Sequence, residues 1–196
     1  MGINYVAIAL VFLMAVVCYR AWRDSAAFQL KCVVSGVDGN EYCVRDRDKL
    51  SLAADRLASV NGKLRAVVDH CKRKYPNEPH VQRMVEGYNP DKVYETLPTS
   101  KYVAYSENKG ERLAFCLKTE KDAGDLIDEN TLAFVALHEL AHIATESIGH
   151  TPEFWRNFRF ILEKAVHLGV YTPVDYKKHN RRYCGTTISD NPYYDE

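Results

Sequence analysis

The sequence predicts one α+β domain behind an N-terminal membrane helix. Residues 3–19 are apolar apart from Asn4 and carry no charge. Downstream, short strand-like runs separated by turn residues alternate with longer segments whose apolar residues recur at helical spacing. With 196 residues, 46% of them apolar, the chain suits one compact core rather than two. We therefore expect a membrane anchor over residues 1–23 and one domain over residues 24–196.

The apolar segment can cross a bilayer as a helix if Ala21 and Trp22 extend it, since a helix rises about 1.5 Å per residue. A cleaved signal peptide is the alternative, but no basic residue precedes the segment and no clean cleavage site follows it. Arg20 and Arg23 follow the segment, and the positive-inside rule then places the domain in the cytosol. The sequence thus predicts a single-pass membrane protein with a cytosolic domain.

Charge and cysteine content set further expectations. The 26 basic and 26 acidic residues cancel, so no global field draws the molecule to nucleic acid. The basic run at residues 177–182 is expected to be a solvated or lipid-facing patch, with DNA contact as the alternative. None of the six cysteines forms a CxxC pair, and a cytosolic domain predicts reduced thiols. With the opposite topology, Cys32 and Cys43 could bridge a hairpin.

The first half of the domain is predicted to contain two hairpins and two helices. Residues 28–34 and 41–45 flank a turn signal, and residues 102–105 and 112–117 flank another with Gly110. Between the hairpins, residues 49–74 have helical spacing, with a possible break at Asn61-Gly62, and residues 80–88 can form a short helix. Residues 90–98 are expected to be irregular.

The second half is predicted to contain two helices and an extended tail. Residues 132–145 are apolar nearly all round, as in a buried helix, and residues 128–131 offer cap residues. Thr151-Pro152 is typical of a helix start, and the next helix covers residues 152–167. The tail from Tyr171 is rich in Tyr, Pro and basic residues.

Residues 138–142 of the buried helix read HELAH and match the HExxH zinc motif. His138 and His142 are four residues apart, so both imidazoles lie on one helix face and can reach one zinc ion. Glu139 then lies beside the metal without binding it, where it can accept a proton from water. A core helix with two hydrogen-bonded histidines is the alternative, but burying these three polar side chains without a metal is costly.

A catalytic zinc site has three protein ligands and an open position. His150 is the predicted third ligand, because it follows Gly149 at the turn toward the next helix. The alternative third ligands are Glu146, Glu153, Glu163 and His167.

HELAH followed by GHTPEFW resembles the WLM and SprT groups of zinc peptidases over about residues 131–162. The resemblance implies a minimal zincin-like domain, in which the active-site helix packs on a small antiparallel sheet. It also implies that His138, His142 and His150 bind Zn²⁺ and that Glu139 is the catalytic base. Positions 145 and 148 are Thr and Ile, which excludes the metzincin pattern. The chain is also similar to uncharacterised membrane-anchored members of this group in large DNA viruses, so the membrane is a host or virion membrane if the chain is viral.

We therefore expect a membrane-anchored zinc metallopeptidase that hydrolyses a protein or peptide substrate. The hairpin at residues 102–117 could offer the substrate an edge strand, and an oxyanion donor could be Tyr171, Tyr176 or Tyr183. One alternative is a non-catalytic zinc-binding membrane or virion protein, whose fourth ligand could be Cys184. Another is a nucleic-acid-associated protease that uses the basic tail. The sequence does not predict the oligomeric state.

Overall fold

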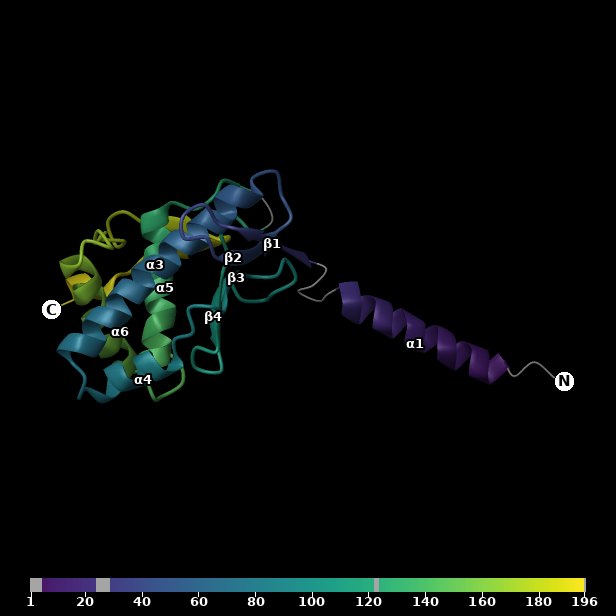
Figure 1. The fold of residues 1–196 in the computed structure, drawn as a ribbon, viewed down its shortest axis with the longest axis horizontal. Helices are drawn as coiled ribbons and strands as arrows, with labels where there is room; N and C mark the ends of the chain where they lie inside the picture. The colour runs from purple at the N-terminus through teal and green to yellow at the C-terminus, as the bar shows by residue number, and fades with distance from the viewer. Residues whose placement is uncertain (1–4, 24–28, 122–123, 196) are drawn as a thin grey trace.

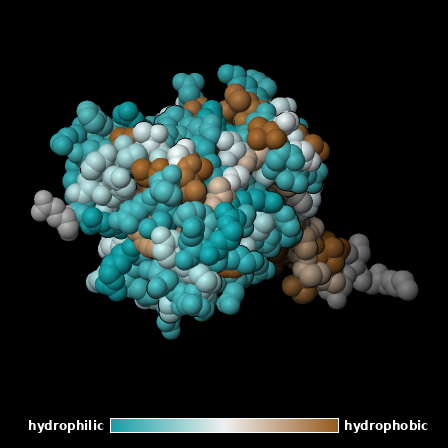
Figure 2. Space-filling model, turned by 60° about the vertical axis from the view of Figure 1, so that its left-hand side comes forward, coloured by the Kyte–Doolittle hydropathy of each residue, from teal (hydrophilic) through white to brown (hydrophobic). Residues whose placement is uncertain are grey.

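A computed structural model describes residues 5–23, 29–121 and 124–195 (Figure 1). Helix α1, Tyr5–Arg23, buries none of its residues and is long and apolar enough to cross a membrane. Figure 2 shows its hydrophobic surface projecting from a largely hydrophilic domain. The predicted N-terminal apolar helix is confirmed, and by length and composition it fits a membrane span or a signal sequence. Residues 1–4 of the predicted anchor and the boundary at residue 24 lie outside the described residues.

Five strands form one sheet in the order β1-β2-β3-β5-β4. Their bounds are Leu30–Val34 (β1), Glu41–Arg45 (β2), Val93–Glu95 (β3), Ala104–Glu107 (β4) and Arg112–Phe115 (β5). The two predicted hairpins are present as antiparallel pairs, β1 with β2 and β4 with β5. Strand β3 runs parallel to both β2 and β5, so the sheet is mixed and the prediction of an antiparallel sheet is wrong. β3 lies in the segment predicted to be irregular, and the helices before it form the crossover that a parallel neighbour requires.

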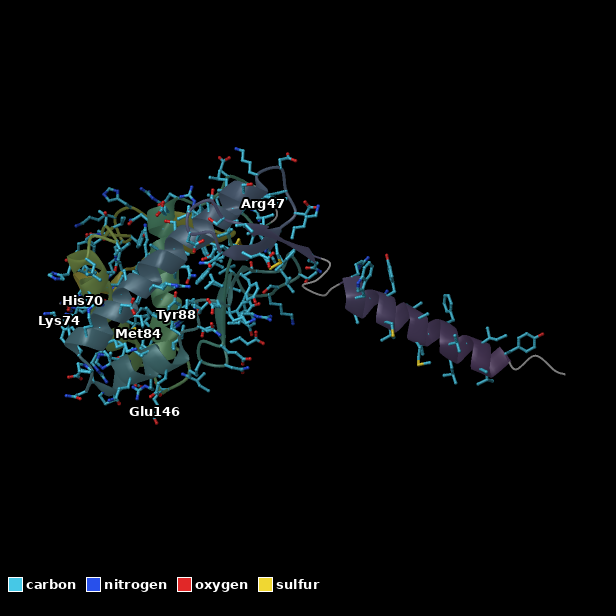
Figure 3. The ribbon with its side chains drawn as sticks, in the orientation of Figure 1. Arg47, His70, Lys74, Met84, Tyr88 and Glu146 are labelled. Atoms are coloured by element: carbon cyan, nitrogen blue, oxygen red, sulfur yellow. A yellow bond between two sulfur atoms is a disulfide. The ribbon has the colours of Figure 1, made fainter. Side chains whose placement is uncertain are left out.

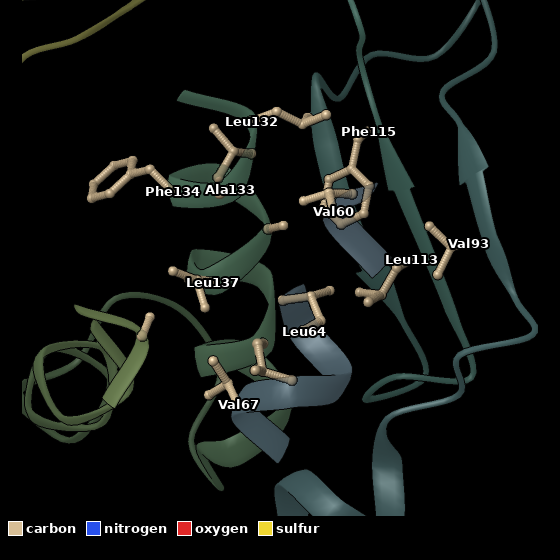
Figure 4. Packing of buried hydrophobic residues seen from close by; sticks show 14 of the residues in the cluster. Val60, Leu64, Val67, Val93, Leu113, Phe115, Leu132, Ala133, Phe134 and Leu137 are labelled. Carbon is tan, nitrogen blue, oxygen red and sulfur yellow. The ribbon is translucent and has the colours of Figure 1, made fainter. Parts of the chain in front are cut away.

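The domain helices lie together on one side of the sheet (Figure 1). Their bounds are Leu50–Lys74 (α3), Pro79–Gly87 (α4), Glu129–Ala144 (α5) and Pro152–His167 (α6). Helix α3 is unbroken at Asn61, because the buried Asn61 amide donates to the Tyr42 hydroxyl and to the Pro90 carbonyl. Figure 4 shows side chains of α3, among them Leu64, between α5 and the sheet. The fold is therefore α+β, with α5 in the core.

The turn between β4 and β5 touches both α4 and the C-terminal half of α5. Gly110 has a φ of +111°, and a Cβ there would collide with the Gly87 carbonyl and the Ile143 side chain. Lys109, in the same turn, donates from Nζ to the Thr145 carbonyl over 2.7 Å, just beyond the end of α5. This cation satisfies an unpaired carbonyl at the negative end of the helix. The turn thereby fixes the end of α5 against the sheet.

The tail is more ordered than the predicted extended segment. It contains the hairpin β6 (Arg181–Tyr183) and β7 (Thr186–Ile188), followed by the short helix η1 (Pro192–Tyr194). Contacts with distant residues hold the hairpin in place: the Cys184 N–H donates to the Lys118 carbonyl, and Arg182 bonds Glu120. Local sequence does not encode such distant contacts.

Four of the six cysteines form disulfides, Cys32 with Cys43 and Cys116 with Cys184. The first bridge joins directly paired residues of β1 and β2, and the second ties the hairpin β6–β7 to the residue after β5. Cys18 and Cys71 are free. The expectation of reduced thiols is therefore wrong for this structure, and it had depended on the cytosolic topology. The cytosolic topology was predicted from Arg20 and Arg23, which follow the apolar segment.

Candidate metal centre

Helix α5 carries the first two predicted ligands. Its N-cap is Asp128, whose side chain accepts the Thr131 N–H over 2.8 Å. The helix is buried on nearly all sides, so its polar residues face either the core or a cleft. His138 and His142 are partly buried, with ring centroids 4.9 Å apart. Their spacing along α5 places both imidazoles on one face, as the motif predicts.

His150 joins them from the loop between α5 and α6. Its Nε2 lies 3.0 Å from Nε2 of His138, and one ligand atom from each of the three histidines lies within 4.8 Å of the others. Two nitrogens about 2.1 Å from one ion at a tetrahedral angle are about 3.4 Å apart, which is close to this spacing. Within the described residues, no fourth His, Cys, Asp or Glu belongs to the cluster. The donor set therefore fits a metal ion held by three imidazoles, with a coordination position left for solvent.

The protonation of the two α5 histidines favours metal binding. Burial lowers the pKa of His138 to about 3, helped by the neighbouring His142 and His150. Burial also lowers the pKa of His142 to about 4, with His150 and Lys109 contributing. Both imidazoles are therefore neutral at pH 7 and have a lone pair for a metal.

The Glu139 side chain lies between α5 and β4, an edge strand of the sheet. It is only 6% exposed, and its carboxylate accepts a hydrogen bond from the Ser106 N–H of β4. Burial raises the pKa of Glu139 to about 8, and the hydrogen bond from Ser106 opposes that shift. The sequence predicts a base beside the metal but contains no signal for the Ser106 contact, because the two residues are distant in the chain.

The four alternative third ligands are not part of the cluster. Glu146 projects from the lower edge of the domain (Figure 3), and its side chain is 83% exposed. Glu163 pairs with Arg159, and the His167 ring contacts His70. Glu153 contacts the loop backbone near His150 rather than the histidines.

The histidines and Glu139 line a cleft of about 1300 Å³. Strand β4 forms one wall, and the hairpin β6–β7 with the residues after it forms another. The α5–α6 loop and Trp155 of α6 lie at the same opening. The wall contributed by the tail was not predicted, because the position of the hairpin depends on the distant contacts described above.

Of the residues considered as a fourth ligand or as oxyanion donors, Tyr183 is the one that lines the cleft. Cys184 is bonded to Cys116, so its thiol cannot serve as a fourth ligand while the disulfide persists. Tyr171 and Tyr176 pack against Phe134 and do not line the cleft. Tyr183 does line it, but its hydroxyl donates to the Val103 carbonyl over 3.2 Å.

The basic run at residues 177–182 is largely paired with carboxylates of the same chain. Lys177 bonds Asp195 over 2.8 Å and also pairs with Asp190. Lys178 pairs with Asp175, and Arg182 pairs with Glu120. Such pairing lowers the positive potential that a phosphate backbone would require.

Fold and site together define an α+β protein with an N-terminal apolar helix and a three-histidine cluster in a cleft. No protein-family model and no solved structure matches the chain. It is 26% identical over 188 residues to "Uncharacterized protein R325" of Acanthamoeba polyphaga mimivirus, covering 94% of this chain and 91% of that protein. It is 36% identical over 83 residues to "Uncharacterized protein 136R" of Invertebrate iridescent virus 6, covering 41% of this chain and 44% of that protein. These relatives come from large DNA viruses, in agreement with the viral resemblance of the sequence.

Proposed function

We propose that this protein is a membrane-anchored zinc metallopeptidase with a zincin-like domain. The observation that carries the proposal is the convergence of His138, His142 and His150 beside a buried glutamate at a sheet edge. A purely structural zinc site closes with four ligands and has no use for an adjacent base. The proposal therefore accounts for Glu139 as well as for the histidines.

The three histidines would hold the ion, and Glu139 would move the protons. When bound, zinc supplies Lewis acidity, which polarises a substrate carbonyl and makes water a better nucleophile at neutral pH. Glu139 would accept the proton of the attacking water and later donate it to the leaving amine. Burial of Glu139 favours its protonated state and raises its pKa, whereas a bound metal ion would favour its charged state, so the two effects would oppose each other.

The substrate class is an extended polypeptide. Among the described residues, β5 is the strand that pairs with β4, so the other edge of β4 has no strand partner and could pair with a substrate strand. All four residues of β4 line the cleft, and the Ser106 N–H contact brings Glu139 to the same strand. A peptide that pairs with β4 would thus pass close to both the base and the histidines.

The test is zinc content and peptide hydrolysis by the full-length chain in detergent. We expect one zinc ion per wild-type chain, sharply weaker binding in His150→Ala, and cleavage of unfolded protein substrates. Glu139→Gln should retain zinc but lose activity by orders of magnitude, because it removes only the base. A zinc-loaded wild type that cleaves nothing would instead favour a non-catalytic zinc-binding membrane or virion protein. A fully active Glu139→Gln variant would exclude the proposed mechanism.

A further inference from the structure

The loop at residues 145–151 must hold His150 near the two histidines of α5, yet its tip has little packing of its own. The Ile148 side chain is 91% exposed. Gly149 has a φ of +85°, and no atom outside its neighbouring residues lies within 4 Å of the position where a Cβ would be. Exposed segments with few contacts sample many conformations. Other residues must therefore restrict the loop.

Glu153, in the first turn of α6, reaches back to this loop. Its Oε1 accepts the Glu146 N–H over 3.2 Å, and its Oε2 accepts the Ser147 N–H over 3.2 Å. The Ser147 hydroxyl also donates to Oε2 over 2.8 Å. One carboxylate thus fixes two consecutive residues shortly before His150.

Arg83 of α4 connects this carboxylate to the helix that carries the other two histidines. Its Nη2 lies 3.1 Å from Oε1 of Glu153, and its Nε donates to the carbonyl of Ala144, the last residue of α5, over 2.9 Å. Charge-assisted bonds of this kind are stronger than bonds between neutral groups. The end of α5 and the loop before His150 are therefore attached to the same ion pair.

We propose that Glu153 is a positioning residue that holds His150 in place for metal binding. This inference rests on the proposed metal site, but it does not require peptidase activity. With Glu153 intact, the loop is ordered before the metal arrives. Without it, Lys109 still donates to the Glu146 and Ser147 carbonyls, but the bonds to their N–H groups are lost. Metal binding must then order more of the loop, and that entropy cost weakens affinity.

The experiment is a double-mutant cycle on zinc affinity, measured by competition with a chromophoric chelator on the full-length chain in detergent. We expect Glu153→Ala to weaken zinc binding about 10-fold, which is the lower end of the affinity losses typical when a residue that supports a metal ligand is replaced. In a His150→Ala background, the same substitution should change affinity by less than about 2-fold, because the ligand through which Glu153 acts is absent. Glu163→Ala is the matched control, since it removes a glutamate of the same helix that pairs with Arg159 and should leave affinity unchanged.

Several results would overturn the inference. An equal loss of affinity in both backgrounds would mean that Glu153 only stabilises the fold, and an unchanged affinity in Glu153→Ala would show that the loop needs no such support. If Glu153→Ala does not fold, Ser147→Ala removes one of the bonds to Oε2 and should weaken zinc binding in the same direction, and an unchanged affinity would again contradict the role. A folded wild type without zinc would overturn both this inference and the proposed function. Zinc binding without hydrolysis would overturn only the proposed peptidase activity.

Discussion

At the scale of single residues, Glu139 combines a polar group with an apolar environment. Its carboxyl is buried, and this burial raises its pKa to about 8 although the hydrogen bond from the Ser106 N–H opposes the shift. The folded, metal-free protein therefore holds a proton on Glu139 up to a pH of about 8, whereas the unfolded chain releases it near 4.5. Between these values the folded state binds more protons than the unfolded state, and stability falls as the pH rises.

Glu139→Gln should remove this pH dependence. The wild type loses stability from about pH 4.5 to about pH 8 through Glu139, while glutamine does not titrate. The difference in unfolding free energy, variant minus wild type, should thus rise across that window, by up to about 3 kcal/mol at pH 7. This difference can be measured by chemical denaturation of both proteins at several pH values, with a chelator present to keep them metal-free. A difference that stays constant from pH 4 to pH 8 would contradict the raised pKa.

His138 and His142 give the folding stability the opposite dependence on pH. Their pKa values are lowered, so the folded state binds fewer protons than the unfolded state below about pH 6.5, and stability rises with pH there. These histidines are present in both the wild type and Glu139→Gln. Their contribution therefore largely cancels in the difference, which is why the variant must be compared with the wild type at each pH.

At the scale of secondary-structure elements, the α5–α6 loop places an apolar side chain at the mouth of the cleft. Ile148 is 91% exposed and lines the cleft, as do Trp155 and Tyr102, which are also exposed. Large apolar side chains at a binding cleft commonly contact a ligand. We therefore expect a peptide substrate to bury part of Ile148.

Ile148→Ser should lower kcat/KM for apolar peptides about 5-fold, because partial burial of this side chain is worth about 1 kcal/mol. Val37→Ser is the matched control, since Val37 is a 58% exposed aliphatic residue that does not line the cleft. Its kcat/KM should equal that of the wild type. Rates on a peptide series measure both variants. Equal kcat/KM values for Ile148→Ser and wild type would exclude a substrate contact at this residue.

Elements with strong local signals were predictable from sequence. Helix α6 begins and ends where predicted, because Thr151 caps it, Pro152 starts it and apolar spacing continues to its end. Strand β3 was not predicted, since three residues carry too little pattern and the strand depends on partners at both edges. Of the candidate site, the HExxH pattern and the turn at Gly149 identified the cluster. The role of Glu153 was not predictable, because its main charged partner, Arg83, is far away in the sequence.

At the scale of the whole molecule, the disulfides and the charges around α1 indicate opposite topologies. Arg20 and Arg23 follow the apolar segment and favour a cytosolic domain. Disulfides, however, persist mainly in oxidising compartments. The bridge between Cys116 and Cys184 spans a sequence separation of 68 and would stabilise the fold by about 4 kcal/mol in the chain-entropy view. Two arginines are a small charge bias, and we give the two bridges more weight.

We therefore expect the domain to lie on the oxidising side of its membrane with both bridges formed. Alkylation of the denatured, unreduced chain should then modify two cysteines, Cys18 and Cys71, and prior reduction should raise the number to all six. Denaturation matters because Cys71 is buried and its pKa is raised to about 11, so the folded protein would hide this thiol. Mass spectrometry counts the labels, and protease treatment of sealed membranes reports the orientation independently. Six labels without reduction, together with a domain exposed on the cytosolic face, would restore the topology that Arg20 and Arg23 favour.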